Sequence, residues 1–329
     1  ANVPVVPGSE GTIRCVDKAK ELAITIGYPV IIKASSGGGG RGMRVVWNEN
    51  ELEKAINSAK AESKGAFGDD SVYMEKYIVN PRHIEFQIIG DEYGNIVHLG
   101  ERDCSLQRRH QKMIEEAPSP VITQSQRVAM GEAAVKAAQA VNYYNAGTIE
   151  FIVDHGGNYY FIEMNTRIQV EHPVTEMITG IDLIKEQINV AAGKPLSFTQ
   201  EDVEIRGHAI ECRINAENPM FNFRPCAGII SGLYLPGGPN VRVETAIYDG
   251  YCVPPNYDSM LLKVIAYGRS RNEAITTMRR ALGEVIIEGI DTNIDFQYQL
   301  IHMPQFESGD FDTSFIEREL TSIIEEMEG

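Results

Sequence analysis

Two glutamates lie at equal distances from a glycine turn, and their pairing could create a metal site. Residues 149–163 read as a β-hairpin, and Gly156-Gly157 as its two-residue turn is a strong hairpin signal. Counting outward from this turn places Glu150 opposite Glu163. Directly paired carboxylates repel unless they are solvated, one is protonated, or a cation lies between them. Because Mg²⁺ takes carboxylate oxygens together with substrate phosphates, a magnesium site and a solvated pair both remain open at this point.

The residues after the hairpin alternate in a way that favours an active-site strand. Every odd position from 163 to 171 is polar, and Met, Thr, Ile and Val occupy the even ones. If the chain stays extended, one face carries Glu163, Asn165, Arg167, Gln169 and Glu171. A solvated strand face is the alternative, but such faces seldom avoid Lys, Ser and Thr so completely. We therefore predict an active-site strand with metal ligands at one end and a carboxylate at the other.

A glycine-rich loop follows an early lysine. Residues 35–42 read Ser-Ser-Gly-Gly-Gly-Gly-Arg-Gly, with Lys33 near the end of one apolar strand and Met43 at the start of the next. Consecutive glycines allow backbone N–H groups to converge on an anion. No G-K-[ST] sequence closes this loop and no helix follows it directly, so it is not a Walker A loop. Its place between strands favours a flap that covers phosphates, with an ordinary flexible hairpin as the alternative.

The hydrophobic pattern around these motifs predicts an α+β protein in two parts. In the first part we expect helices at 12–26 and 50–64 and strands at 29–34, 43–47 and 72–77. In the second part we expect strands at 83–89, 96–100, 148–153 and 159–163 and helices at 123–141, 182–193, 271–284 and 313–327. The chain should therefore form a small lid-like unit and a larger, mostly antiparallel domain.

Composition narrows the class of protein. The chain has 329 residues, of which 43% are hydrophobic and 23% charged, as in soluble globular proteins. The net charge of -16 argues against a general nucleic-acid binder, which needs a basic surface. The 5 cysteines are scattered, with no C-x-x-C pair, so neither a disulfide framework nor a zinc site is expected. No apolar run is long enough to span a membrane, and we expect a cytoplasmic protein.

Together the motifs closely resemble the biotin carboxylase family of the ATP-grasp superfamily, along essentially the whole chain. The stretches that carry the resemblance are Ile32 to Ser35 with the glycine loop, Met74 to Tyr77, Glu101 to Lys112 (ERDCSLQRRHQK), Phe161 to Thr179 (FIEMNTRIQVEHPVTEMIT), Arg206 to Glu217 (RGHAIECRINAE) and Tyr257 to Met260. The resemblance implies an ATP-grasp fold, with a small glycine-loop lid domain at 5–77 and a larger, mostly antiparallel C-terminal domain at 78–329.

The resemblance also assigns roles, position by position. The ATP-binding residues it implies are Lys33, Gly39, Gly40, Met43, Glu75, Lys76, Ile78, His83, Gln107 and His110. The implied ligands of Mg²⁺ (or Mn²⁺) are Glu150, Glu163 and Asn165, which agrees with the hairpin argument. The implied bicarbonate site consists of Lys112, Arg167, Gln169 and Val170. Glu171 matches the general base and Arg213 the residue that faces the biotin oxygen, and with Arg167 and Lys112 they form the catalytic set.

The implied chemistry suits these residue types. Bicarbonate must lose a proton to attack the γ-phosphate of ATP, so a carboxylate such as Glu171 has to lie within its reach. The resulting carboxyphosphate breaks down to CO₂ and phosphate, and that phosphate can take the proton from N1 of biotin. The enolate oxygen that develops on biotin needs a preorganised cation, for which Arg213 is the candidate. The planar fork of Arg167 can hold a flat anion through two hydrogen bonds.

The resemblance further implies the setting of this reaction. Family members carboxylate biotin on a carrier protein, as the first half-reaction of acetyl-CoA carboxylase in fatty acid synthesis. We expect a biotin carboxyl carrier protein and carboxyltransferase subunits as partners, and a homodimer is possible. No Ala-Met-Lys-Met attachment motif is present, so biotin should arrive on another chain. His172-Pro173 favours an acyl-CoA carboxylase over a pyruvate carboxylase.

Two departures from the family pattern bear on activity. Ser36 replaces the first of five consecutive glycines found in many relatives, a change that we expect to be tolerated. Family members also begin with a further domain, which carries a lysine that contacts the nucleotide phosphates, and the present sequence matches the family only after that domain. We therefore expect the 329-residue chain alone to fold but to show little or no turnover.

Two other functions fit parts of the sequence. Another ATP-grasp ligase, such as a carbamoyl-phosphate synthase, would share the glycine loop and the Glu150, Glu163 and Asn165 set. It would lack the Arg-x-Gln-x-Glu run that ends at Glu171 and leads into His172-Pro173. A non-catalytic nucleotide-binding module would be expected to have lost Glu171 or Arg213, and both are present.

Overall fold

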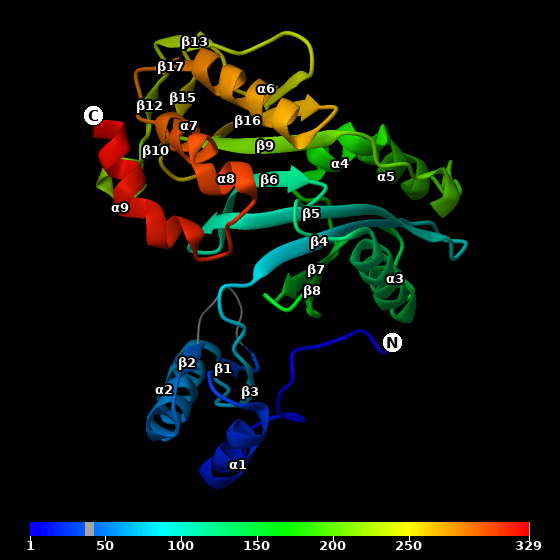
Figure 1. Ribbon diagram of the computed structural model, residues 1–329, viewed down its shortest axis with the longest axis vertical. Helices are drawn as coiled ribbons and strands as arrows, with labels where there is room; N and C mark the ends of the chain where they lie inside the picture. The colour runs from blue at the N-terminus through cyan, green and yellow to red at the C-terminus, as the bar shows by residue number, and fades with distance from the viewer. Residues whose placement is uncertain (37–42, 329) are drawn as a thin grey trace. The chain divides into compact units, whose positions relative to one another are not determined.

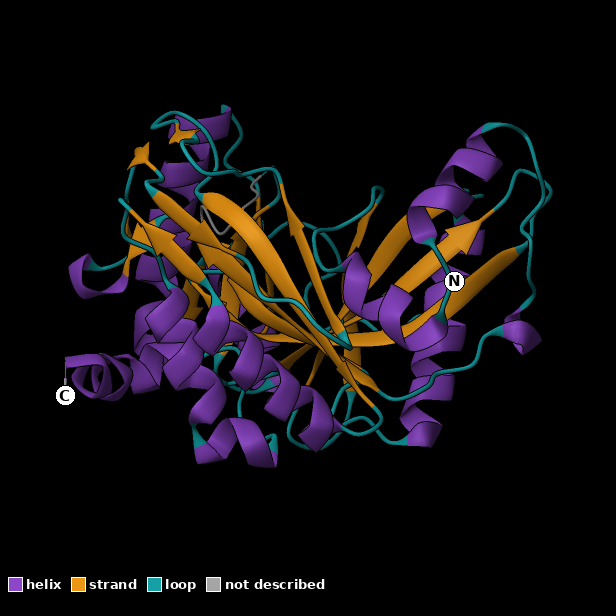
Figure 2. Cartoon of the chain, turned by 90° about the horizontal axis from the view of Figure 1, so that it is seen from above, coloured by secondary structure: helices purple, strands orange, loops and turns teal. Residues whose placement is uncertain are grey.

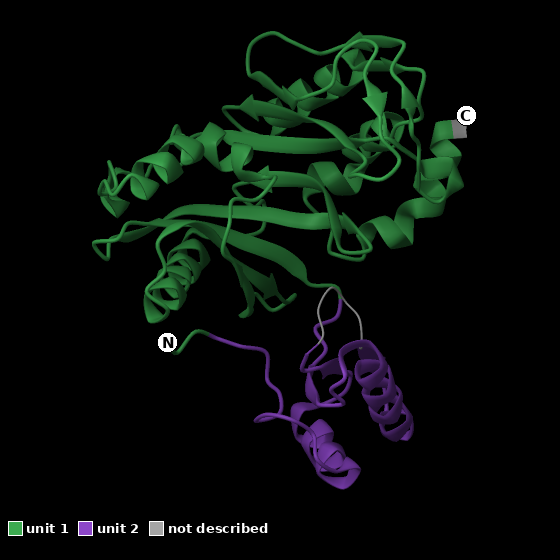
Figure 3. Ribbon diagram, turned by 180° about the vertical axis from the view of Figure 1, so that it is seen from behind, with its two compact units in different colours: residues 1–3, 80–329 green, residues 4–79 purple. Residues whose placement is uncertain are grey.

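A computed structural model describes residues 1–36 and 43–328. Within this range the chain forms two compact units, one of residues 4–79 and the other of residues 1–3 and 80–329 (Figure 3). The predicted glycine loop lies almost wholly outside the described residues, and Gly39 and Gly40 lie in that gap.

The smaller unit is a three-stranded antiparallel sheet in the order β2-β1-β3, packed against two helices. Its elements are α1 (Val16–Ile26), β1 (Val30–Ala34), β2 (Arg44–Val46), α2 (Glu49–Phe67) and β3 (Val72–Lys76). Apolar residues of the strands, such as Ile32 and Met74, share one core with Leu52 and Ile56 of α2. All five predicted elements are present, although α1 begins four residues later than the predicted start at residue 12.

The larger unit is built on an eight-stranded antiparallel sheet in the order β14-β16-β9-β6-β5-β4-β7-β8. Its first elements are β4 (Arg82–Gly90), β5 (Ile96–Arg108), β6 (Gln111–Ala117), α3 (Gln124–Ala140), β7 (Asn145–Val153), β8 (Tyr159–Asn165), α4 (His172–Thr179) and α5 (Leu183–Ala191). After a short turn, η1 (Gln200–Asp202), come β9 (His208–Asn215), β10 (Glu217–Asn218), η2 (Pro219–Phe221), β11 (Arg224–Pro225), β12 (Gly228–Ile229), β13 (Gly232–Tyr234), β14 (Val241–Thr245), β15 (Cys252–Val253), β16 (Met260–Gly268), α6 (Arg271–Glu284), β17 (Ile286–Glu288), α7 (Ile294–His302), α8 (Pro304–Ser308) and α9 (Phe315–Glu328).

The eight-stranded sheet buries mainly apolar side chains on one side and many polar and charged side chains on the other. On one side α3 packs on β4 and β5, and α6 packs on β16 and β9 (Figure 1). In β4 the apolar residues Ile84, Phe86 and Ile88 face the α3 core, so the alternate residues point to the opposite face. That opposite face, here called the polar face, carries Glu85, Gln87, Arg102, Glu115, Thr148, Glu150, Glu211, Arg213 and Lys263.

Helix α4 covers part of the polar face. Its Val174 and Ile178 pack on Ala117, Ala209 and Ile265, which lie on the same side of β6, β9 and β16 as the charged residues. Helix α4 contacts β5, β6, β9 and β16 and so covers charged residues of this face. Figure 2 shows the helices of the chain packed against its strands. The charges are therefore buried, and each needs a partner.

The predicted pairing of Glu150 with Glu163 is confirmed, but the predicted turn is wrong. Asp154 and Asn158 close a three-residue loop, with Gly157 at a positive φ of 81°, so the register starts one residue away from the prediction. A β-bulge at Ile162 shifts the register back before Glu163 is reached. The longer turn and the bulge each shift the register by one residue, in opposite directions, so Glu150 still pairs with Glu163.

The prediction of one extended strand from 163 to 171 is also wrong. Strand β8 ends at Asn165, the chain then turns, and Glu171 is the residue directly before α4. The polar residues in this stretch therefore do not share one strand face. Gln169 and Glu171 are buried, whereas Glu163 and Arg167 are exposed.

The described part of the chain has no helix with the length and apolar character needed to cross a membrane.

A buried ion pair ties the apolar side of the large sheet to α6. The Glu116 carboxylate lies 2.6 Å from Nε2 of His208 and accepts two hydrogen bonds from Arg271, at 2.7 and 3.0 Å. Burial alone would raise the pKa of Glu116, but His208 and Arg271 lower it to about 2. The ionised form is therefore strongly favoured in the folded chain.

We predict that Glu116→Gln lowers the free energy of unfolding by about 3 kcal/mol at pH 7, because Arg271 and the buried His208 lose the carboxylate that they share. Since the folded pKa lies below the ordinary value of 4.5, the wild-type advantage is complete above pH 4.5 and disappears as the pH falls towards 2. Chemical denaturation across this range measures it. Glu132→Gln, in an exposed pair with Lys136, should change stability by less than about 0.5 kcal/mol. Equal losses for the two variants would contradict the prediction.

Candidate active site

The centre of the polar face is a lysine among three carboxylates. The Nζ atom of Lys112 lies 2.5 Å from Glu85, 2.6 Å from Glu171 and 3.2 Å from Glu150. Burial alone would lower the pKa of Lys112, but Glu85 and its other acidic neighbours raise it well above the ordinary value. Lys112 is therefore a fixed cation at neutral pH.

The carboxylates around Lys112 are held in their ionised form. Although burial opposes ionisation, Lys112 and then Arg102 lower the pKa of Glu85 to about 2. Burial opposes ionisation of Glu150 as well, but His83 and Lys112 hold its pKa far below the usual range. Both side chains can therefore bind cations or accept hydrogen bonds throughout the physiological pH range.

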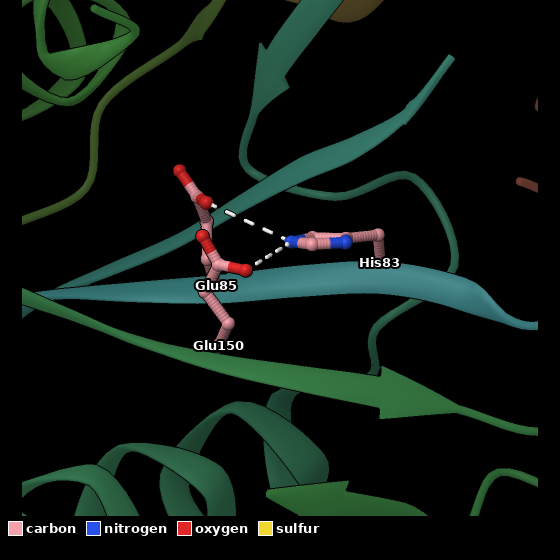
Figure 4. A group of neighbouring side chains, drawn as sticks. All are labelled: His83, Glu85 and Glu150. Atoms are coloured by element: carbon pink, nitrogen blue, oxygen red, sulfur yellow. Dashed lines mark ion pairs between the residues drawn. The ribbon is translucent and has the colours of Figure 1, made fainter. Parts of the chain in front are cut away.

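Figure 4 shows a second partner of these carboxylates, His83 of β4. Its Nε2 atom lies 3.0 Å from Glu150 and 3.9 Å from Glu85. The strand register explains the cluster, because Glu85 pairs directly with Glu150 across β4 and β7. Ligand atoms of the three residues lie within 4.8 Å of one another, as a shared cation would require. The same is true of Glu85, Cys104 and Glu171.

Glu171 connects Lys112 to a second cation. One carboxylate oxygen accepts from Lys112 at 2.6 Å, and the other accepts from Nη2 of Arg213 at 2.9 Å. Arg213 is also paired with the buried Glu115, at 2.6 Å through its Nε atom. A carboxylate buried between two cations is held in one orientation.

The turn after β8 brings the remaining predicted residues towards this cluster. The Gln169 amide donates to Glu150 at 2.9 Å, and Asn165 donates to the same carboxylate at 2.9 Å. Lys263 of β16 donates to the carbonyl oxygen of Val170 at 2.7 Å, which fixes the backbone beside Glu171. Arg167 is exposed and contacts Asn165 at 3.2 Å.

The other predicted ATP-binding residues are divided between the two units. In the smaller unit, Lys33 of β1 is paired with Glu75 of β3 at 2.5 Å, and Lys76 donates to two backbone carbonyls at 2.9 Å each. Met43 and Ile78 of the same unit are half-buried. In the larger unit, Gln107 is buried at the end of β5 and His110 is exposed in the turn that follows. Gln107 pairs with Lys112 across β5 and β6, but neither the Gln107 nor the His110 side chain has a hydrogen bond to the Lys112 cluster within the described range.

Sequence reasoning missed five titratable residues that complete the polar face. They are Glu85, Arg102, Glu115, Glu211 and Lys263. A signal was available for Glu85, because His83, Glu85 and Gln87 occupy alternate positions of a predicted strand. Arg102 lies inside the matching stretch from 101 to 112, but nothing in its spacing indicates which strands it contacts.

Comparison with known proteins places the chain in a family. Residues 1–199 match the family model "Carbamoyl-phosphate synthase L chain, ATP binding domain", and residues 211–318 match "Biotin carboxylase C-terminal domain". Biotin carboxylase 1 of Bacillus subtilis is 59% identical over 96% of this chain and 71% of its own length. A pyruvate carboxylase subunit from Methanothermobacter thermautotrophicus is 55% identical over 99% of this chain and 66% of its own length.

A solved structure supports the same family assignment. The biotin carboxylase domain dimer of Hydrogenobacter thermophilus 2-oxoglutarate carboxylase, in complex with MgADP, ADP and bicarbonate, superposes with a TM-score of 0.90. It is 51% identical and covers 98% of this chain and 71% of its own. The fold is thus the ATP-grasp fold of ATP-dependent ligases. The chain belongs to the biotin carboxylase family.

We predict that Lys112→Met lowers the free energy of unfolding by about 3–5 kcal/mol when divalent cations are removed with EDTA. The reason is that Glu85, Glu150 and Glu171 would be left buried without their shared cation. Denaturant titration measures the loss. The matched control is Lys136→Met, whose ammonium lies 3.8 Å from the exposed Glu132 and should contribute less than about 0.5 kcal/mol. A Lys112 variant no less stable than this control would show that the carboxylates are compensated by other means.

Proposed function

We propose that this chain carboxylates biotin with bicarbonate and MgATP, and that the polar face around Lys112 is where bicarbonate is activated. The observation that carries the proposal is the position of Glu171, whose carboxylate lies between Lys112 at 2.6 Å and Arg213 at 2.9 Å. Lys112 can hold an anion beside Glu171, the proposed base, and Arg213 can stabilise negative charge on biotin. Family membership and the bicarbonate in the Hydrogenobacter thermophilus structure support this assignment.

In the first step Glu171 acts as the general base. Lys112 with Arg167, Gln169 and the backbone of Val170 holds bicarbonate, and a carboxylate oxygen of Glu171 takes its proton. The freed bicarbonate oxygen attacks the γ-phosphorus of ATP, and the bond from that phosphorus to the bridging oxygen of ADP breaks. The products of this step are carboxyphosphate and ADP.

In the second step Arg213 stabilises the charge that forms on biotin. Carboxyphosphate breaks into CO₂ and phosphate, and the phosphate takes the proton from N1 of biotin. The negative charge that develops on the ureido oxygen lies against the Arg213 guanidinium, which Glu115 holds in place. N1 then forms its bond to the carbon of CO₂.

The residues proposed for magnesium fit that ion. Glu150, Glu163 and Asn165 offer oxygen atoms, which Mg²⁺ prefers, and Glu163 is paired with Glu150 across β7 and β8. Glu163 is exposed and has no ion-pair partner in the described part of the chain, so its carboxylate is available to a cation. When bound, Mg²⁺ would neutralise phosphate charge on ATP. We propose that the nucleotide itself is held by Lys33, Gly39, Gly40, Met43, Glu75, Lys76, Ile78, His83, Gln107 and His110.

The wider setting also belongs to the proposal. We propose that residues 5–77 act as the ATP-grasp lid and residues 78–329 as the C-terminal domain. A biotin carboxyl carrier protein, carboxyltransferase subunits, a homodimer and a cytoplasmic location stay predictions. The similar proteins include part of a pyruvate carboxylase and a 2-oxoglutarate carboxylase domain, so the specific role in acetyl-CoA carboxylase and fatty acid synthesis stays a prediction as well.

The direct test is ADP formation that depends on both bicarbonate and free biotin, measured on the protein at its full natural length. Glu171→Gln keeps the shape of the side chain but removes its basicity, so the rate should fall by roughly 10²–10⁴ while ATP still binds. Glu201→Gln, a surface change in η1, should leave the rate unchanged. If Glu171→Gln kept the wild-type rate, the base would have to be another residue.

The two arginines should separate in their kinetics. Arg213→Ala should lower kcat much more than it raises the KM for bicarbonate, because its proposed partner forms only as biotin loses its proton. Arg167→Ala should raise the KM for bicarbonate instead. Steady-state kinetics at varied bicarbonate measures both, and the opposite pattern would reverse the two roles.

A further inference from the structure

Arg102 of β5 is a fully buried arginine, with 0% of its surface exposed. Every N–H of its guanidinium has an acceptor in the described structure. Nε donates to Glu85 at 2.5 Å, Nη1 to Gln87 at 2.7 Å and to Thr175 at 3.0 Å, and Nη2 to Thr148 at 3.2 Å and to Gln169 at 3.0 Å. Arginine alone among the side chains has five N–H donors in one plane, so no other residue could satisfy this set of acceptors.

Three of these acceptors also contact, or lie on the same element as, residues of the proposed reaction. Glu85 accepts from Arg102 through one oxygen and from Lys112 through the other, at 2.5 Å in each case. Thr175 lies in α4, the helix that begins directly after Glu171. Gln169 touches Arg102 at one end of its amide and Glu150 at the other.

The contact with Gln169 has a consequence for the direction of its amide group. A guanidinium has donors and no acceptor, so only the amide oxygen of Gln169 can face Arg102. The NH₂ group must then face Glu150, at 2.9 Å, on the side of the Lys112 cluster. Arg102 thereby turns Gln169 into a donor towards any anion bound there.

Stability alone does not explain this arrangement. A buried ion pair can often be replaced as a whole, both partners together, by apolar residues without loss of stability. Arg102 instead has Glu85 as its one charged partner and four neutral acceptors that come from four different segments. Such a set fixes the directions of side chains, which is what a site for a small planar anion needs.

We propose that Arg102 is a positioning residue for bicarbonate activation, acting through Gln169, Glu85 and α4 without touching the substrates. This inference rests on the proposed function and deepens it. The ATP-binding set should be little affected, because Arg102 has no hydrogen bond to any of its members in the described structure.

The first test is Arg102→Lys, which keeps the charge beside Glu85 but offers three donors in place of five. In the full-length protein, kcat/KM for bicarbonate should fall by about 10- to 100-fold, as expected when reacting groups move by about 1 Å. The KM for ATP should change by less than about threefold. A folded variant with wild-type bicarbonate kinetics would overturn the proposal.

The second test compares two threonines and decides the matter even if Arg102→Lys does not fold. Thr175 and Thr148 are both fully buried and both accept from the guanidinium, at 3.0 and 3.2 Å. Only Thr175 lies on the helix that follows Glu171. Thr175→Val should lower kcat/KM for bicarbonate by about tenfold, and Thr148→Val by less than about twofold, at similar losses in Tm.

Equal kinetic effects of the two threonine variants would reduce Arg102 to a structural residue and overturn the proposal, with the proposed function intact. The two failures are distinguishable through the wild-type protein. If wild-type ADP formation did not depend on bicarbonate, the proposed function would fall, and this inference with it.

Discussion

The ammonium group of Lys112 lies between Glu85, Glu150 and Glu171, and most of the polar face can be understood as what this contact requires. Three carboxylates around one lysine would repel one another, so further cations must lie behind them. Arg102 supplies one behind Glu85, and Arg213 another beside Glu171. Arg102 is fully buried and held by several acceptors, and Arg213 is half-buried and held by another carboxylate, Glu115.

Where carboxylates still outnumber cations, burial favours the protonated form. Glu115 and Glu211 are paired across β6 and β9, beneath Arg213. Burial raises the pKa of both, with Arg213 opposing the shift at Glu115 and Glu115 adding to it at Glu211. Both oxygens of Glu211 lack a hydrogen-bond partner within the described structure, as a neutral acid tolerates better than a carboxylate does. The sheet can bury so much charge because its other face is an ordinary apolar core.

The sequence was sufficient for all five elements of the smaller unit and for β4, β5, α3, β7, β8, α5, α6 and α9 of the larger one, because periodicity is a local signal. The pairing of Glu150 with Glu163 was also predicted correctly, but only because two errors cancelled. The sequence did not predict the three-residue turn or the bulge at Ile162. These two errors shifted the strand register by one residue in opposite directions. Sequence reasoning failed for the path after Asn165, since alternation predicts a strand whether or not a neighbouring strand exists to pair with it. Arg102 could not be assigned because its partners come from β4, β7, the turn after β8 and α4, which only the fold brings together.

The central claim is that this charged face turns bicarbonate into the nucleophile that attacks ATP. Bicarbonate labelled with ¹⁸O tests it most directly, with ATP, biotin and the full-length protein, in a reaction stopped before label exchanges with water. If bicarbonate oxygen attacks the γ-phosphorus, each inorganic phosphate that accompanies ADP carries one labelled oxygen, because carboxyphosphate loses only its CO₂. Phosphate without label would mean that water attacks ATP instead, and would contradict the account.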